Sequence, residues 1–225
     1  MIKKLFTVAL CSVALSCGDS TNTGLNSSTA SKIGKPVSAE ELNLTINKSL
    51  MIPAGQFARK RGDTMKPRYI TIHSTQNPAA SANARLHATA LRHGRLKSRN
   101  NSLGYLSWHY SVDQSTIYQS LPDNEQGQHA DYDGPGNTSS IGIEMCENRG
   151  NNLEATMELT ARLAAYLMRQ YRIPIENIVP HQHWRRIRFS DQRDLGFKNC
   201  PHFLMTNGQP GEKWDTFKKR IEKYL

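Results

Sequence analysis

Three histidines and a cysteine carry side chains that can bind a metal ion. His181 and His183 lie two residues apart in the segment VPHQHW, and Cys200 follows in KNCP. His73 ends a segment rich in aromatic and β-branched residues. Catalytic zinc sites take three protein ligands from His, Cys and carboxylates and leave a fourth position to water. These residues could form such a site if the fold brings them together, although spacing alone is weak evidence in a chain with eight histidines.

The elements that would position these residues follow from hydrophobic periodicity. Apolar residues that alternate, or recur at helical spacing, predict four strands (68–73, 108–113, 115–119, 140–146) and three helices (81–93, 153–172, 213–224). His181 and Cys200 are assigned to loops. Strands that alternate with helices of this length predict an α/β fold, with a central mixed sheet of five or six strands flanked by helices.

Six segments occur in an order that resembles the zinc-dependent N-acetylmuramoyl-L-alanine amidases of the type 2 family. They are YITIHST (69–75), SWHYSVD (107–113), GQHA (127–130), SIGIEMCEN (140–148), VPHQHW (179–184) and KNCP (198–201). The resemblance covers about residues 45–205 and is strongest to amidases of Bacillus species and their prophages. It implies the fold shared with animal peptidoglycan-recognition proteins. It also implies hydrolysis of the amide bond between N-acetylmuramic acid and L-alanine in peptidoglycan.

Carried onto this chain, the resemblance makes His73, His181 and Cys200 the zinc ligands, and Glu144 and Lys198 the catalytic pair. Zinc would lower the pKa of a water molecule and polarise the amide carbonyl. Glu144 would accept the water proton and pass it to the departing nitrogen, while Lys198 would stabilise the oxyanion. No organic cofactor is expected, and a monomer suffices.

Each of these assignments has a structural alternative. Glu144 lies between apolar strand residues and could point to solvent, and Lys198 taken alone reads as a solvated surface lysine. His183 could replace His181 as a ligand, although the resemblance favours His181. Cys146 reads as a small buried apolar residue.

Four residues are expected to contact substrate: Trp108, His109, His129 and His183. His129 lies in the segment that matches a groove-lining loop of the family. Trp108 stands where some phage relatives carry a catalytic tyrosine, so it is expected to pack or to stack on substrate. His109 is more typical of a packed strand histidine, although its strand should border the cleft. His183 is expected to act near the metal or on substrate.

Residues 185–197, RRIRFSDQRDLGF, form a longer and more basic link than the corresponding segment of Bacillus relatives. Such an insertion could reshape one wall of the groove, or add an electrostatic contact to glycan or peptide.

The first 17 residues have the organisation of an export signal. A basic start precedes an apolar run that is too short to span a membrane. Ser16 and Cys17 resemble a bacterial lipobox, although Ala14 stands where an aliphatic residue is usual. We therefore expect lipidation of Cys17, with an ordinary cleaved signal as the alternative. A glycine after the cysteine favours an outer-membrane lipoprotein that faces the periplasm.

The segment after the signal predicts a tether. Residues 18–43 are rich in Ser, Thr, Asn and Gly, and such a composition buries too little apolar surface to fold. An amidase domain is expected over 44–225. Once the signal is removed, only Cys146 and Cys200 remain, with Cys17 if it is retained, so no disulfide framework is expected.

A formal net charge of +10 favours attraction to a polyanion such as a cell-wall polymer or a membrane surface. The basic residues are scattered, and the densest runs are 185–186 and 218–220. Nucleic acid is therefore not the expected partner.

Two other functions remain open at this stage. One is a peptidoglycan-binding module without catalysis, although relatives of that kind typically lose the cysteine ligand. The other is a zinc hydrolase that cleaves a different amide of the stem peptide.

Overall fold

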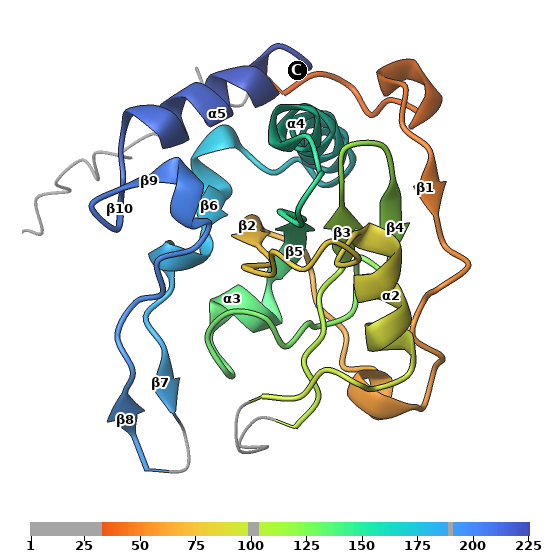
Figure 1. Cartoon of the computed structure of the whole chain (residues 1–225), viewed down its shortest axis with the longest axis vertical. Helices are drawn as coiled ribbons and strands as arrows, with labels where there is room; N and C mark the ends of the chain where they lie inside the picture. Colours follow the sequence, from red (N-terminus) through yellow and green to blue (C-terminus); the bar gives the residue numbers. More distant parts are fainter. Residues whose placement is uncertain (1–32, 99–103, 189–190) are drawn as a thin grey trace, which may run out of the picture.

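The computed structural model describes residues 33–98, 104–188 and 191–225, and its centre is a six-stranded sheet. The strands stand in the order β1-β4-β3-β5-β2-β6, and every neighbouring pair is parallel except β3 and β4. Their bounds are Ile46–Asn47 (β1), Tyr69–Ser74 (β2), Tyr110–Val112 (β3), Ile117–Gln119 (β4), Ser140–Met145 (β5) and Ile178–Pro180 (β6). The mixed sheet of five or six strands is confirmed (Figure 1).

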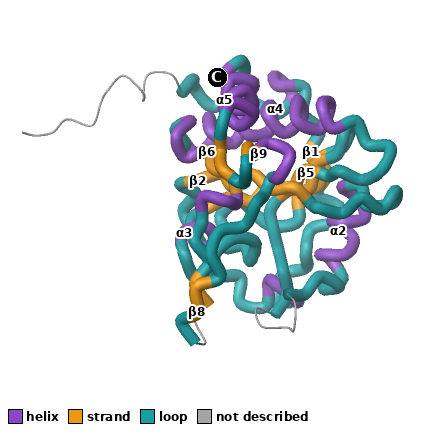
Figure 2. The backbone as a smooth tube through the Cα atoms, turned by 60° about the vertical axis from the view of Figure 1, so that its left-hand side comes forward, coloured by secondary structure: helices purple, strands orange, loops and turns teal. Residues whose placement is uncertain are grey.

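Helices cover both faces of this sheet. The longer helices α4 and α5 lie together on one side of the strands, while α2 and α3 lie on the other (Figure 2). The bounds are Ala84–Arg92 (α2), Pro135–Thr138 (α3), Leu153–Tyr171 (α4) and Glu212–Glu222 (α5). Short 3-10 helices span Glu40–Leu42 (η1), Phe57–Arg59 (η2), Ile175–Asn177 (η4), His181–His183 (η5) and His202–Leu204 (η6). Two hairpins complete the structure: β7 (Ile187–Arg188) with β8 (Arg193–Asp194), and β9 (Met205–Thr206) with β10 (Gln209–Pro210).

Strands β2 and β5, which are neighbours in the sheet, each present one apolar and one polar face. Side chains alternate along a strand, so Ile141, Ile143 and Met145 of β5 enter the main core beneath α4, and all three are fully buried. The residues between them project to the opposite side. Because β2 pairs with β5 in the register His73 to Glu144, these two polar residues lie side by side on that opposite face.

Helix α4 forms where the periodicity predicts it, because both of its ends are capped. The Asn152 side chain accepts a hydrogen bond from the amide of Ala155, which is worth about 1 kcal/mol at a helix start. At the other end, Arg172 adopts the left-handed conformation, and Ile173 and Pro174 follow. The helix buries ten residues against the sheet and α5.

Three expected elements are shorter than predicted. Helix α2 begins at residue 84 rather than 81, because Asn83 caps it by accepting from the amide of Leu86. Strands β3 and β4 lose their facing ends because the Asp113 carboxylate accepts from the amides of Ser115 and Thr116, which folds 113–116 into a turn. Strands β1 and β6 were not predicted, since they have only two and three residues.

The tether expected over 18–43 does not extend that far. The backbone carbonyls of Lys35 and Val37 accept hydrogen bonds from Arg169 and Gln170 of α4, and Leu42 packs against the main core. This correction follows from a contact with a helix about 130 residues away in the chain, which local composition does not encode. The signal, Cys17 and tether residues 18–32 lie outside the described residues. Among the described helices, none combines the length and apolar character needed to cross a bilayer.

Candidate metal centre and catalytic site

Three distant segments bring His73, His181 and Cys200 together. His73 lies near the end of β2, and His181 directly follows β6; these strands are parallel neighbours, paired at Ile72 and Pro180, so their carboxyl ends coincide. The Cys200 sulfur accepts a hydrogen bond from the amide of Ser74, at 3.3 Å. The potential ligand atoms of the three residues all lie within 4.8 Å of one another.

The two histidines have the properties that metal ligands require. Both are buried. His181 Nε2 lies 3.2 Å from the carbonyl oxygen of Ala130, while its Nδ1 is buried without a hydrogen-bond partner among the described residues. Burial and then Lys198 lower the pKa of His181 to about 3. Burial and the neighbouring His181 and His129 also hold the pKa of His73 well below its usual value. Both rings are therefore neutral, as ligand imidazoles must be.

The cysteine completes a donor set that suits zinc. Burial raises the pKa of the Cys200 thiol to about 12, and the nearby Glu144 adds to this effect. A thiolate at this position therefore requires a compensating cation, which a bound metal would provide. Two imidazole nitrogens and one sulfur are a donor set that zinc accepts in a tetrahedral site with one open position.

Glu144 faces this cluster, and the solvent-facing alternative is wrong. Its Oε1 lies 3.8 Å from Nδ1 of His73, and its side chain is only 13% exposed. Its other oxygen, Oε2, is buried without a partner among the described residues. Burial raises the pKa of this carboxyl group to about 7, against the opposing influence of Lys198. A carboxyl group that titrates near neutral pH suits general acid–base catalysis.

A cavity of about 200 Å³ opens beside the cluster. Glu144 and His181 line it together with Lys198, Arg186, Trp108 and His129. Lys198 is half-buried, and its charge acts on Glu144, Cys200 and His181. Of the three candidate ligands, His181 lines this cavity, together with both residues of the expected catalytic pair.

The expected substrate-contacting residues occupy different environments. Trp108 lines the cavity, but its indole nitrogen donates to the Ser111 hydroxyl and its ring packs in a second core cluster. His109 is fully buried: Nδ1 accepts from the amide of Gly142, and Nε2 lies 2.8 Å from the carbonyl oxygen of Glu125. Both of its nitrogens are engaged, which matches the packed-histidine alternative.

His183 and Cys146 lie outside this cluster. His183 is exposed and makes an edge contact with Trp184. It does not belong to the group of residues whose ligand atoms converge. Cys146 is buried, as expected, with its sulfur 3.8 Å from Nδ1 of His87.

His129 lines the cavity and also contacts His73. Its Nδ1 is 3.1 Å from Nε2 of His73. The ring fits because Gly127 and Gly142 carry no side chain: a Cβ atom would approach the ring to 2.5 Å at Gly127 and to 2.9 Å at Gly142. A glycine inside a strand indicates such a close approach, so Gly142 was the feature of the sequence that could have predicted a side chain packed against this strand. The Asn137 side chain also holds this loop, by accepting from the amides of residues 129 and 130.

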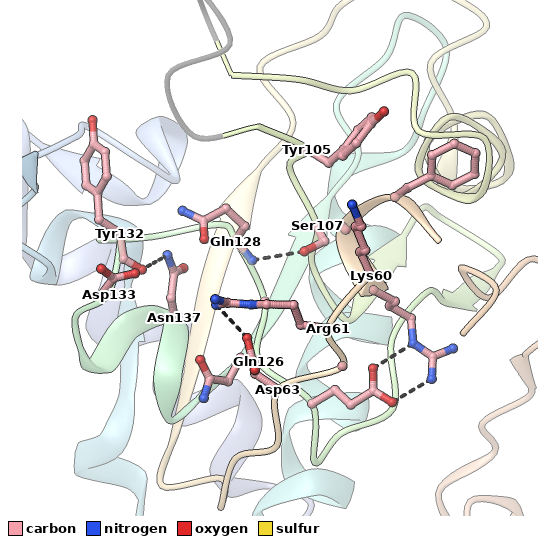
Figure 3. A pocket seen from close by; sticks show the side chains of 16 residues that line it. Lys60, Arg61, Asp63, Tyr105, Ser107, Gln126, Gln128, Tyr132, Asp133 and Asn137 are labelled. Carbon is pink, nitrogen blue, oxygen red and sulfur yellow. Dashed lines mark hydrogen bonds and ion pairs between the residues drawn. The ribbon is translucent and has the colours of Figure 1, made fainter. Parts of the chain in front are cut away.

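A second cavity of about 220 Å³ adjoins the first and shares Gln128, Tyr132 and Asn137 with it. Figure 3 shows Tyr132 and Asn137 at one end, and Tyr105 with Lys60 at the other. A bidentate ion pair between Arg59 and Glu125 braces its wall. The two cavities provide room for a polar substrate longer than a single amide.

Comparisons with known proteins agree with this geometry. The family model described as N-acetylmuramoyl-L-alanine amidase matches residues 63–203. The amidase XlyA of Bacillus subtilis is 38% identical over 171 residues, which are 76% of this chain and 49% of XlyA. The amidase CwlH of the same species is 37% identical over 158 residues, 69% of this chain and 53% of CwlH.

A solved structure titled as the catalytic domain of XlyA superposes with a TM-score of 0.62 at 35% identity. The match covers 79% of this chain and 99% of that one. The present chain spans about half the length of the two full-length relatives. The family expected from the six sequence motifs is confirmed: this chain belongs to the N-acetylmuramoyl-L-alanine amidase family.

Proposed function

We propose that the protein is a zinc-dependent amidase that hydrolyses the bond between N-acetylmuramic acid and L-alanine in peptidoglycan. One observation carries this proposal: His73, His181 and Cys200 converge within 4.8 Å, and the Glu144 carboxylate lies beside them. Family membership supports the choice of bond. Zinc bound by these three residues would supply Lewis acidity and a water molecule of lowered pKa.

Glu144 acts as the proton carrier. Its carboxylate takes a proton from the attacking water and delivers it to the amide nitrogen as the carbon–nitrogen bond breaks. A pKa of about 7 places the group where both transfers are accessible near neutral pH. The unpartnered Oε2 atom is available for this work, since no donor in the described part of the chain is bonded to it.

Lys198 acts as the fixed cation of the site. It lines the same cavity as Glu144 and His181, and it stabilises the negative charge that develops on the carbonyl oxygen during attack. The histidines contribute as neutral ligands because burial lowers their pKa values, and His129 and Ala130 orient their rings through hydrogen bonds.

A chelation experiment on purified peptidoglycan sacculi tests the activity. Digestion should stop in a chelator and return with zinc, and mass spectrometry of the products should show intact muramic acid and new L-alanine amino termini. New amino termini at another stem-peptide residue would reassign the bond. Binding to sacculi without turnover would support the recognition module instead.

Cys200→Ser tests the site, with Cys146→Ala as the matched control at the other buried cysteine. We expect Cys200→Ser to lose both zinc content and digestion while its circular dichroism is unchanged. Cys146→Ala should retain both, since its sulfur lies outside the ligand group. A Cys200→Ser protein that digests sacculi normally would remove the cysteine from the site.

Export and anchoring through Cys17 complete the proposal. Peptidoglycan lies outside the cytoplasmic membrane, so the enzyme must leave the cytoplasm to reach it, and the basic net charge favours retention near anionic envelope polymers. A second acyl chain would make such an anchor stable. Metabolic labelling with a fatty acid should mark the natural chain and not Cys17→Ala. Equal labelling of the two would contradict lipidation at this residue.

A further inference from the structure

Within the expected insertion at 185–197, strands β7 and β8 pair as a hairpin that projects from the body. Strands β7 and β8 extend away from α4 and α5 (Figure 1), and Figure 2 shows the same projection from another side. Its base is closed by two backbone hydrogen bonds, from the Arg186 amide to the Gly196 carbonyl and from the Leu195 amide to the Arg186 carbonyl. Arg186, at this base, lines the cavity beside the three candidate ligands. The hairpin therefore begins at the edge of that cavity.

The hairpin contains four arginines, which are Arg185, Arg186, Arg188 and Arg193. Arg185 pairs with Asp194 and Arg188 pairs with Asp191, and these pairs are exposed on the outside. Neither Arg186 nor Arg193 has a carboxylate within ion-pair distance among the described residues, but Arg193 is exposed. Of the four arginines, Arg186 is the one that lines the cavity. Its charge is therefore uncompensated and faces the site.

The Arg186 guanidinium is held in place without being neutralised. Its Nη2 donates to the carbonyl oxygen of Leu195 at 2.8 Å, and its Nε donates to that of Gly196 at 3.3 Å. Nη1 forms no hydrogen bond with any residue that the structure describes. A planar guanidinium with part of its donors fixed is preorganised for a carboxylate, which it recognises better than a lysine does.

The chemistry of the substrate indicates which group Arg186 meets. The lactyl carboxyl group of muramic acid is consumed in the scissile amide, so the sugar beside that bond carries no charge. The nearest anionic group is a carboxylate on the peptide residue that follows L-alanine. In our proposed function, Lys198 stabilises the negative charge on the carbonyl oxygen. Arg186 therefore remains available to bind the peptide carboxylate.

We propose that Arg186 is a specificity-determining residue that binds this peptide carboxylate and so aligns the stem peptide on the hairpin side of the metal. The inference rests on the proposed function. It predicts that the enzyme distinguishes a free carboxylate from an amidated one at that residue.

Two matched ligands test the inference: N-acetylmuramoyl-L-alanyl-γ-D-glutamyl-L-lysine with the glutamate α-carboxyl group either free or amidated. Calorimetric titration into the zinc-loaded Glu144→Gln protein measures binding without turnover. We expect the free carboxylate to bind about tenfold more tightly, as for a charge-assisted hydrogen bond. Adding Arg186→Gln should bring that ratio to about one, and Arg186→Lys should recover part of it.

Arg185→Gln and Arg188→Gln are the controls, since both remove a hairpin charge outside the cavity and should keep the ratio. A merely structural role of Arg186 would weaken both ligands equally and leave the ratio unchanged, which would overturn the inference. Equal affinity of the zinc-loaded Glu144→Gln protein for the free and the amidated ligand would also overturn it. Turnover of the two ligands by the natural enzyme is scored separately: cleavage of neither would reject the proposed function, while the binding ratio still decides the role of Arg186.

Discussion

The two faces of β5 differ in how they use burial. The face toward α4 is occupied by Ile141, Ile143 and Met145, which are fully buried and carry no charged or hydrogen-bonding N or O atom in their side chains. The opposite face holds Gly142 and Glu144, next to buried imidazoles and a buried thiol. Burial of apolar surface stabilises the fold, whereas burial of ionisable groups shifts their pKa and costs stability. The same strand thus supports the structure on one side and the chemistry on the other.

Glu144→Gln should produce the largest effect on the polar face. The amide retains the shape of the side chain but cannot carry a proton, so kcat should fall by about 10²–10⁴-fold. Zinc content, measured by elemental analysis, should be unchanged because Glu144 is not one of the converging ligand residues. A variant with normal kcat would separate Glu144 from the reaction.

Ile143→Ala tests the apolar face of the same strand. Truncation of this fully buried side chain leaves a cavity beneath α4, which should lower the free energy of unfolding by about 2–5 kcal/mol. Denaturant titration gives this value. The zinc affinity of the folded fraction should match that of the natural protein, and a large loss of zinc affinity would show that the two faces are not independent.

Gly142→Ala tests the polar face of β5 at the position next to Ile143. The two residues are neighbours in sequence, but their side chains point to opposite faces of the sheet. The new methyl group would meet the His129 ring at 2.9 Å, so that ring must shift and release its contact with His73. Loss of a group that orients a ligand typically weakens metal binding by about 10–100-fold. Competition with a chromogenic chelator measures this. Unaltered zinc affinity would exclude a positioning role for His129.

Replacement of His109 should produce the smallest effect, which is a change in how the stability of the fold depends on pH. Burial lowers its pKa from the ordinary value, so the unfolded state binds more protons once the pH falls below about 6.5. Its stabilisation is complete above pH 6.5 and is lost as the pH falls toward the folded-state pKa.

In His109→Gln, the decline of the melting temperature below pH 6.5 should therefore be shallower than in the natural protein. Thermal melts between pH 4 and pH 8 provide the comparison, and the slope, unlike the absolute stability, is insensitive to the lost hydrogen bonds. Identical slopes would mean that other groups govern the acid range.

Local patterns predicted much of the fold because those elements are stabilised by their own periodicity and caps. Helix α4 and strand β5 appear within one residue of the expected bounds, since each buries a regular apolar stripe. Strand β6 was missed because a three-residue segment ending in proline has no such stripe. The segment 33–43 was misjudged because its polar backbone is satisfied by α4, a partner remote in sequence.

The residue types of the site could be named from motifs, but their selection required contacts. Residue type and spacing do not distinguish His181 from His183, although the motif resemblance favours His181. The pairing of β6 with β2 places His181 beside His73. Arg186 cannot be told from Arg185 by type or spacing. The folded hairpin separates them, because Arg186 lines the cavity whereas Arg185 pairs with Asp194.

By itself, the sequence determined the mixed α/β class, the family and the kinds of side chain available for chemistry, because periodicity and motif order are local properties of the chain. The tertiary structure alone decided which of those side chains converge, which are buried with unsatisfied atoms and which charge remains unpaired. Those properties depend on distances between segments more than 100 residues apart, such as the one between Ser74 and Cys200, and only folding brings such segments together.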